Sequence, residues 1–186
     1  LKMRIPGLGG EVFRKAGGVP VALAGGEVFT ALQTGVVDAA EWVGPYNDLA
    51  FSLYKASKFY YYAGWHEPGA TLECMVNKQA FESLPDDLKA IVETACSSVN
   101  NTMLAEFTAR SMEALEELEN KHKVQVREFP PDVMAALRRL TAETLDEIAA
   151  RDPVFRKVFD SYRTFQQRVR RWTDISERAY LNSRYG

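Results

Sequence analysis

The chain has 186 residues, of which 46% are hydrophobic and 26% are charged, and its formal net charge is −2. This composition is typical of a folded globular protein, and it excludes intrinsically disordered, collagen-like and disulfide-dense chains. No run approaches the roughly 18 consecutive apolar residues of a membrane-spanning helix. The length allows one domain, or two small lobes, with a buried core.

The charge is distributed unevenly along the chain. Residues 151–186 contain nine Lys or Arg and four Asp or Glu, so they carry +5, while residues 1–150 carry −7. A basic segment can indicate contact with nucleic acid. Here, however, the basic residues are interleaved with apolar and aromatic ones such as Phe155, Tyr162 and Trp172. The pattern therefore favours an amphipathic helix that docks on its own protein or on a partner subunit, and we expect no nucleic-acid partner.

The first 77 residues contain eleven of the twelve glycines and alternate strand-like with helical segments. This alternation predicts an α/β fold with parallel β-α-β units. Gly7-Leu8-Gly9-Gly10 follows the first strand, but Val12 stands where a dinucleotide-binding motif needs its third glycine, so we interpret these residues as a turn. The predicted strands are 1–5, 19–23, 36–42, 59–65 and 70–76, and the predicted helices are 11–16, 27–34 and 46–57.

Residues 78–185 contain no glycine and have mainly helical patterns. Apolar residues recur every three or four positions between 88 and 107, which predicts one long amphipathic helix over about 85–123. A strand is expected over 124–129 and a helix over 130–150. Asp152-Pro153 is a helix-start signal, and the last helix is expected over 154–182.

Residues capable of catalysis are few. No nucleophile-elbow, zinc-protease or C-x-x-C motif is present, and His66 and His122 lie far apart in the sequence. We interpret His66 as a surface or hydrogen-bonded histidine rather than a catalytic or metal-bound one. Cys74 and Cys96 are interpreted as buried free thiols, with a disulfide between them as the alternative.

Two glutamates stand at the ends of strand-like segments. Glu41 lies at the carboxyl end of the predicted strand 36–42, where ligands of open α/β sheets bind. Glu67 lies in the turn Gly64-Trp65-His66-Glu67-Pro68-Gly69. Two carboxylates from separate segments suit a hard cation, which prefers oxygen ligands. The residues leave open whether the two carboxylates meet or are separate solvated acids.

Several motifs in combination resemble a known family. They are LKMRIPG at 1–7, AGGEVFTALQTGVVDAAEW at 24–42, GPYND at 44–48, the aromatic run at 59–62 and GWHEPG at 64–69. The chain resembles the solute-binding proteins of TRAP (tripartite ATP-independent periplasmic) transporters, and most closely the branch that binds 2-oxo and 2-hydroxy monocarboxylates with a metal ion. Ala24 and Tyr46 depart from the proline and tryptophan that are frequent there.

The resemblance implies a periplasmic-binding-protein-like fold with two α/β lobes and long helices. It covers essentially all 186 residues, and it implies that they are the C-terminal portion of a longer protein, without its signal peptide and N-terminal part. Residues 1–42 would belong to the second lobe, 43–129 would cross to the first lobe and include a long connecting helix, and 130–186 would form C-terminal helices that include a dimerisation helix.

The resemblance also implies the site residues. Arg4 matches the arginine that pairs with the ligand carboxylate. Glu41 and Glu67 match two metal-ligand positions, and Trp42 matches a residue that offers its backbone carbonyl to the metal and a wall to the pocket. Asn47 is expected to be a polar contact near the ligand. The implied cofactor is a metal ion, Ca²⁺ or Na⁺.

The implied function is transport rather than catalysis. A periplasmic solute-binding protein would capture a pyruvate- or lactate-like carboxylate, deliver it to the membrane permease of the TRAP transporter, and form a homodimer through its C-terminal helix. Two alternatives stay open. One is a hydroxy-acid isomerase or dehydrogenase that uses Glu41, Glu67 or His66 as a general base. The other is a helical protein-interaction module.

Overall fold

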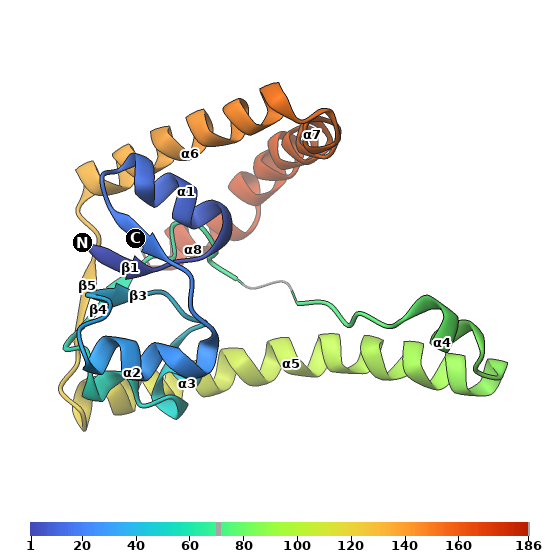
Figure 1. The fold of residues 1–186 in the computed structure, drawn as a ribbon, viewed down its shortest axis with the longest axis horizontal. Coiled ribbons are helices and arrows are strands. Elements are labelled where there is room, and N and C mark those ends of the chain that lie inside the picture. Colours follow the sequence, from blue (N-terminus) through green and yellow to red (C-terminus); the bar gives the residue numbers. More distant parts are fainter. Residues whose placement is uncertain (70–71, 186) are drawn as a thin grey trace. The chain divides into compact units, whose positions relative to one another are not determined.

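The computed structural model describes residues 1–69 and 72–185. It consists of two compact units, Leu1–Leu137 and Arg138–Gly186. The first unit contains both β-sheets, and the second is helical (Figure 1). The boundary between them falls inside one helix, α6 (Pro131–Arg151).

A three-stranded parallel sheet with the order β2-β1-β3 forms the start of the first unit. Met3 pairs with Pro20 on one side and with Ala39 on the other. The predicted parallel β-α-β arrangement is therefore confirmed, although each strand is shorter than predicted because only a few residues face a partner strand. The elements are β1 (Lys2–Arg4), α1 (Gly7–Lys15), β2 (Val19–Val21), the 3-10 turn η1 (Gly25–Glu27), α2 (Val28–Gln33) and β3 (Ala39–Ala40).

The core of this sheet depends on close approach between helix and strand. Ile5, Val28 and Val37 are each 1% exposed. A Cβ atom at Gly10 would lie 2.6 Å from the backbone oxygen of Ile5, so α1 packs this closely only because position 10 has no side chain. The prediction of a turn over Gly7-Leu8-Gly9-Gly10 is wrong, because these residues form the first turn of α1.

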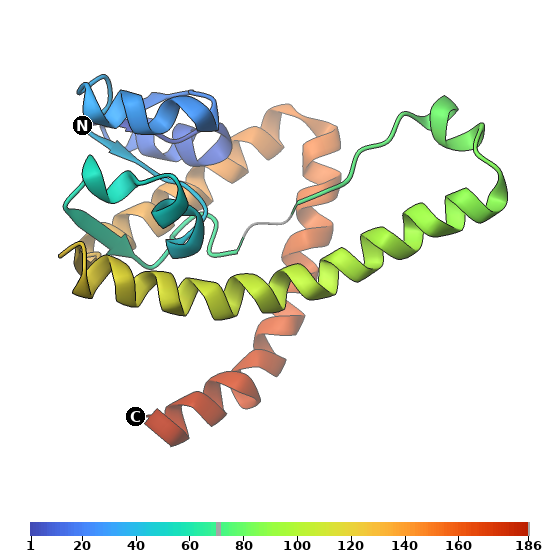
Figure 2. The same cartoon turned by 90° about the horizontal axis from the view of Figure 1, so that it is seen from below.

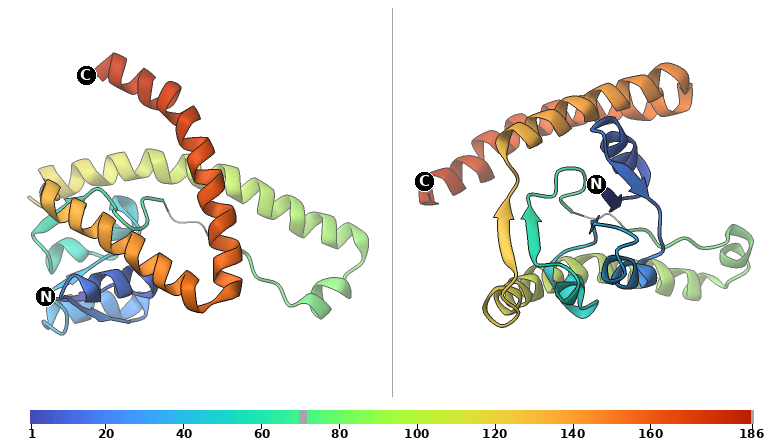
Figure 3. Two further views of the ribbon diagram at one scale, coloured as in Figure 1. Left: turned by 90° about the horizontal axis from the view of Figure 1, so that it is seen from above. Right: turned by 60° about the vertical axis from the view of Figure 1, so that its left-hand side comes forward.

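A second, two-stranded sheet pairs β4 (Phe59–Tyr62) with β5 (Gln125–Glu128) in parallel. These strands are far apart in sequence and lie side by side, as the right-hand view of Figure 3 shows. The connection between them includes α5 (Asp86–Asn120), which confirms the predicted long helix, and α3 (Pro45–Ala50) packs against it.

Two local predictions in this region are wrong, and one helix was not predicted. The predicted helix 46–57 is divided into α3 and the 3-10 turn η2 (Leu53–Lys55), because Ser52 has a left-handed φ of 57°. Residues 72–76 of the predicted strand 70–76 have no regular structure, and positions 70 and 71 lie outside the described residues. The helix α4 (Lys78–Glu82) was not predicted; the Asn77 side chain caps it by accepting a 3.0 Å hydrogen bond from the Ala80 N–H.

The apolar stripe of α5 is covered only near the C-terminal end of the helix. Ala114 and Leu118 are 4% and 2% exposed. By contrast, Ile91, Val99 and Leu104 are 61%, 56% and 73% exposed. Figure 2 shows how far α5 extends away from the two sheets. Much of the apolar surface on the first half of α5 is therefore exposed among the described residues.

The second unit consists of the end of α6, α7 (Pro153–Ile175) and α8 (Glu177–Tyr185). The Asp152 carboxylate caps α7 by accepting hydrogen bonds from the N–H groups of Val154 (2.8 Å) and Phe155 (3.0 Å). The single predicted helix 154–182 is divided at Ser176, and the left-hand view of Figure 3 shows the resulting bend. Among the described helices, none is long and apolar enough to cross a membrane.

Candidate functional site

Arg4 ends β1 and is held from several sides. Its Nε donates to the backbone oxygen of Leu23 at 3.2 Å, and its Nη1 donates to the backbone oxygen of Glu41 at 3.1 Å. Nη1 also forms an ion pair with the Glu41 carboxylate, and the guanidinium lies 5.2 Å from the Trp42 ring centroid. The side chain is only 11% exposed. These contacts fix the guanidinium at the carboxyl end of the parallel sheet, where α/β folds bind ligands.

The Arg4–Glu41 pair leaves part of the guanidinium available. Among the hydrogen bonds of the described residues, the Arg4 donors are Nε and Nη1, so Nη2 keeps its donors for another acceptor. Breaking such a buried pair by removing one partner typically costs about 3–5 kcal/mol, because the remaining charge is left uncompensated. The arginine is thus both ordered and able to take up an anion.

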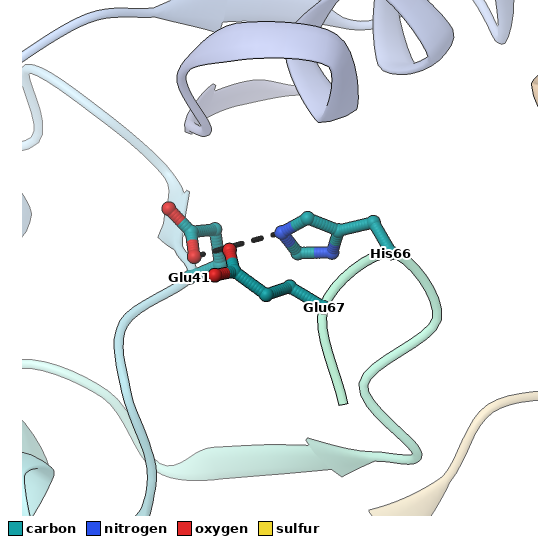
Figure 4. Close-up of side chains that lie close together, drawn as sticks. All are labelled: Glu41, His66 and Glu67. Carbon is teal, nitrogen blue, oxygen red and sulfur yellow. Dashed lines mark ion pairs between the residues drawn. The ribbon is translucent and has the colours of Figure 1, made fainter. Parts of the chain in front are cut away.

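Glu41, His66 and Glu67 form a cluster close to this arginine (Figure 4). One ligand atom from each of the three residues lies within 4.8 Å of the others. Glu41 follows β3, whereas His66 and Glu67 belong to the loop after β4, so the fold brings together two segments that are distant in sequence. The two glutamates, whose meeting the residues alone left open, do lie close together. Carboxylate oxygens at this spacing suit a hard cation.

His66 was interpreted only as a surface or hydrogen-bonded residue, and its place in the cluster was not predicted. Its Nε2 lies 3.6 Å from Glu41 Oε2, and its side chain is 19% exposed. The ring packs on α1, since a Cβ at Gly9 would come within 2.9 Å of His66 Cδ2. The only sequence signal for this role is that His66 precedes Glu67. A ring beside a metal-binding carboxylate is suited to orienting that carboxylate.

Trp42 forms a wall next to Arg4. Its ring packs against Phe51 with centroids 5.2 Å apart. A Cβ at Gly25 would lie 2.4 Å from the Trp42 ring, so the indole occupies space that a side chain at position 25 would need. The position of the Trp42 ring therefore requires a glycine at position 25, the first residue of η1.

Several buried polar side-chain atoms have no hydrogen-bond partner among the described residues. Within the described part of the chain, Trp42 Nε1, Asn47 Oδ1 and His66 Nδ1 are buried and make no hydrogen bond. Buried polar groups almost always have a partner. Since Trp42 packs on Arg4 and His66 belongs to the cluster, the ring nitrogens of these two residues are available to a polar ligand there.

Asp48 and Tyr60 form a second buried polar pair, which was not predicted. The Tyr60 hydroxyl donates a 2.6 Å hydrogen bond to Asp48 Oδ2 and so connects α3 with β4. Burial raises the pKa of the Asp48 carboxyl to about 6. Burial and the nearby Asp48 charge raise the pKa of the Tyr60 hydroxyl, which stays a hydrogen-bond donor. No sequence pattern links these residues, because their contact depends on how β4 lies beside α3.

Comparison with known proteins identifies the family of the chain. The sequence profile of the DctP family, described as bacterial extracellular solute-binding protein, family 7, matches residues 1–152. The chain belongs to this family. The resemblance stated from the sequence motifs is therefore confirmed. A relative from Nostoc sp. (strain PCC 7120), named monocarboxylate 2-oxoacid-binding periplasmic protein, is 40% identical over 182 residues, which are 98% of this chain and 50% of the relative.

Solved structures of TRAP periplasmic solute-binding proteins share the fold. Those from Colwellia psychrerythraea, with bound calcium and pyruvate, and from Pseudoalteromonas atlantica, with bound sodium and pyruvate, each give a TM-score of 0.92 at 41% identity and cover 98% of this chain and 56% of theirs. A Bordetella bronchiseptica protein is described as a mixed-occupancy dimer with calcium and picolinate. It gives a TM-score of 0.94 at 36% identity, and the match covers 100% of this chain and 55% of the Bordetella chain. The predicted fold class is thus confirmed, and the chain spans about half the length of the DctP relatives that it matches.

Proposed function

We propose that the protein containing this chain captures a small 2-oxo or 2-hydroxy carboxylate, together with Ca²⁺ or Na⁺, as the extracytoplasmic component of a TRAP transporter. The observation that carries the proposal is the placement of Arg4 against Glu41, with the cluster of Glu41, His66 and Glu67 beside it. A fixed guanidinium and a pair of carboxylates together complement a ligand that combines an anion with a cation.

Arg4 is proposed to bind the ligand carboxylate. A guanidinium offers two parallel N–H donors that match two carboxylate oxygens, which a lysine cannot reproduce. In the structure Arg4 holds the Glu41 carboxylate instead. Ligand entry is then an exchange of partners: the incoming carboxylate takes the place of Glu41 at Arg4, and Glu41 turns to the cation. Both charges stay paired throughout, which avoids an isolated buried ion.

The net charge of the proposed site favours binding of a cation together with the ligand carboxylate. Arg4, Glu41 and Glu67 together carry a formal charge of −1. A bound cation supplies positive charge to the carboxylate and to the 2-oxygen of the ligand. Glu41 and Glu67 are its proposed side-chain ligands, because hard cations prefer oxygen over the imidazole nitrogen of His66. His66 is proposed to orient Glu41.

Trp42 and Asn47 are proposed to complete the pocket. Trp42 offers its ring as a wall and its backbone carbonyl to the cation. The Asn47 side chain, whose Oδ1 is buried without a partner among the described residues, is proposed as a polar contact to the ligand. The captured solute would be delivered unchanged to the membrane permease, and the location of the protein would be the periplasm.

The protein is proposed to form a homodimer through its C-terminal helices. Val158, Tyr162 and Trp172 on α7 are 65%, 57% and 65% exposed, so the apolar face of this helix is open to a partner. A dimeric Bordetella bronchiseptica relative is consistent with a second copy as that partner.

Isothermal titration calorimetry with pyruvate in the presence of Ca²⁺ tests the ligand site on the full natural gene product that contains residues 1–186. Arg4→Ala is expected to weaken binding by about 30-fold or more, since truncating one partner of a buried charge pair costs about 2–5 kcal/mol. Arg4→Lys keeps the charge but loses the fork, and is expected to weaken binding as well. Arg14→Ala, which removes an exposed arginine paired with Glu11, is the control and should bind like the wild type.

Equal affinity in the Arg4→Ala and Arg14→Ala variants would show that the carboxylate binds elsewhere. Recovery of unchanged pyruvate in a stoichiometric complex distinguishes capture from the isomerase or dehydrogenase alternative, for which turnover is expected.

A further inference from the structure

Two cysteines from different segments lie next to each other. Cys74 belongs to the irregular segment that precedes α4, and Cys96 lies on α5. Both are exposed, and the two thiols are close enough to influence each other, since Cys74 raises the pKa of the Cys96 thiol. They line one cavity of about 570 Å³ together with Phe81 and Val92. The interpretation of both residues as buried thiols is therefore wrong, and neither cysteine has a part in the proposed ligand site.

We propose that Cys74 and Cys96 form an intrachain disulfide in the exported protein. The inference rests on export, which is characteristic of this extracellular family, and not on the class of ligand. Disulfides form and persist in oxidising compartments outside the cytoplasm. Because both cysteines line the same cavity, a shift of the segment that carries Cys74 can bring the two sulfurs to bonding geometry, which is specific in distance and direction.

The local backbone permits this movement. Leu72–Val76 belong to no helix or strand in the described chain, so the segment that carries Cys74 is free of ladder hydrogen bonds that would resist a shift. Cys96, in contrast, is fixed within the 35-residue helix α5. One partner can thus adjust while the other stays in place.

The reaction is thiol–disulfide exchange with an oxidant that is itself a disulfide, either a protein oxidant or oxidised glutathione. The Cys74 thiolate attacks one sulfur of the oxidant, whose S–S bond breaks to give a mixed disulfide and a thiolate. Cys96 then loses its proton and attacks the Cys74 sulfur, which releases the second half of the oxidant as a thiolate. Two electrons and the protons of both cysteines pass to the oxidant.

The bond would close the chain between Cys74 and Cys96 into a loop that contains α4 and the beginning of α5 (Figures 1 and 2). Such a cross-link stabilises the folded state chiefly by restricting the unfolded chain.

The test is a thiol count on the full natural gene product, isolated from the periplasm and alkylated at harvest under denaturing conditions. No free thiol at positions 74 and 96 is expected before reduction and both are expected after it, with the oxidised chain running as a monomer on a non-reducing gel. Two alkylated cysteines without reduction would overturn the proposal, and so would a covalent dimer that replaces the intrachain bond.

Cys74→Ser and Cys96→Ser are matched variants. Each is expected to expose the remaining cysteine as a free thiol. Reduction is expected to lower the melting temperature of the wild type by several degrees, and to leave that of the Cys74→Ser/Cys96→Ser double variant unchanged. An equal shift in both proteins would contradict a stabilising bond between these residues. Pyruvate titration of the double variant separates this inference from the ligand site, since loss of the disulfide alone does not remove Arg4, Glu41 or Glu67.

Discussion

The Asp48 carboxyl links the stability of the fold to pH. Burial raises its pKa from 3.8 to about 6, and the hydrogen bond from Tyr60 only partly opposes this. Between pH 4 and pH 6 the folded state consequently binds more protons than the unfolded state. Stability is therefore lost as pH rises through this range, and above it the charged Asp48 costs the folded state about 3 kcal/mol.

Asp48→Asn is expected to remove this pH dependence. The amide cannot ionise, so the free energy of unfolding should change less between pH 4 and pH 7 than in the wild type. At pH 8 the variant should be more stable, by up to about 3 kcal/mol less any loss in the hydrogen bond to Tyr60. Urea unfolding at several pH values, in the presence of a chelator, measures the difference. Asp160→Asn, at an exposed position on α7, is the control. A wild-type pH profile in Asp48→Asn would contradict the assignment.

Substitutions of the adjacent residues Gly25 and Gly26 can distinguish the effect of packing against Trp42 from the effect of reduced backbone flexibility. A Cβ at Gly25 would meet the Trp42 ring at 2.4 Å, whereas one at Gly26 meets nothing within 4 Å. Gly25→Ala is expected to displace the indole and to destabilise the protein by about 1–3 kcal/mol, the usual cost of overpacking. Gly26→Ala should be close to neutral. Thermal unfolding together with tryptophan fluorescence distinguishes the two, and similar behaviour of both variants would mean that the ring does not depend on position 25.

Helices with a long and regular pattern of apolar residues could be predicted from the sequence, whereas short or interrupted elements could not. The helix α5 was predictable because residues 78–185 contain no glycine and because its apolar spacing extends over many turns. The five-residue helix α4 was not, since a single Asn77 cap and one turn give too little periodicity. The break at Ser52 depends on a left-handed backbone that serine rarely adopts, so no local propensity indicates it.

The candidate site follows the same division. Glu41 and Glu67 became candidates from their places at the ends of strand-like segments, and Arg4 from motifs that resemble those of a family. His66 and the Asp48–Tyr60 pair did not, because their contacts arise from packing between segments that lie apart in sequence. Burial in particular cannot be read from composition: Cys74 and Cys96 are residues of a type that is usually buried, and here both are exposed.

The apolar stripe of α7 is exposed and has the spacing of a surface that packs against another helix. Val158, Tyr162, Phe165, Val169 and Trp172 recur at steps of four and three residues, which is the spacing of a helix–helix contact, and all five are exposed. A contiguous exposed apolar face of this kind marks an interaction surface.

Phe165→Ser combined with Trp172→Ser is expected to convert the proposed dimer to a monomer, because it removes two aromatic anchors from the stripe. Gln167→Ser, also on α7, keeps these anchors and serves as the control. Light scattering coupled to size-exclusion chromatography measures the mass. Deletion of residues 170–186 should likewise leave a monomer or an insoluble chain, and an unchanged dimer in either case would refute the role of this helix.

For the whole protein, the proposed cation and carboxylate depend on each other. Ca²⁺ takes roughly six to eight oxygen ligands. Glu41 and Glu67 are the two carboxylates of the cluster, so together they cannot complete that number. The oxygens of the bound carboxylate would supply further ligands, and the cation would in turn neutralise excess negative charge where the carboxylate binds.

This dependence predicts a reciprocal coupling between the two ligands. Raising Ca²⁺ should increase the affinity for pyruvate by at least about tenfold, and saturating pyruvate should increase the affinity for Ca²⁺ by the same factor, since coupling free energies between binding sites are symmetric. Calorimetric titrations of each ligand with and without the other give both factors. Glu67→Gln should reduce both, because one charged oxygen ligand is lost, while Glu73→Gln, at an exposed position outside the cluster, should leave them unchanged. If pyruvate binds with the same affinity in chelator as in Ca²⁺, the carboxylate is held without a cation, and the cluster of Glu41, His66 and Glu67 has another role.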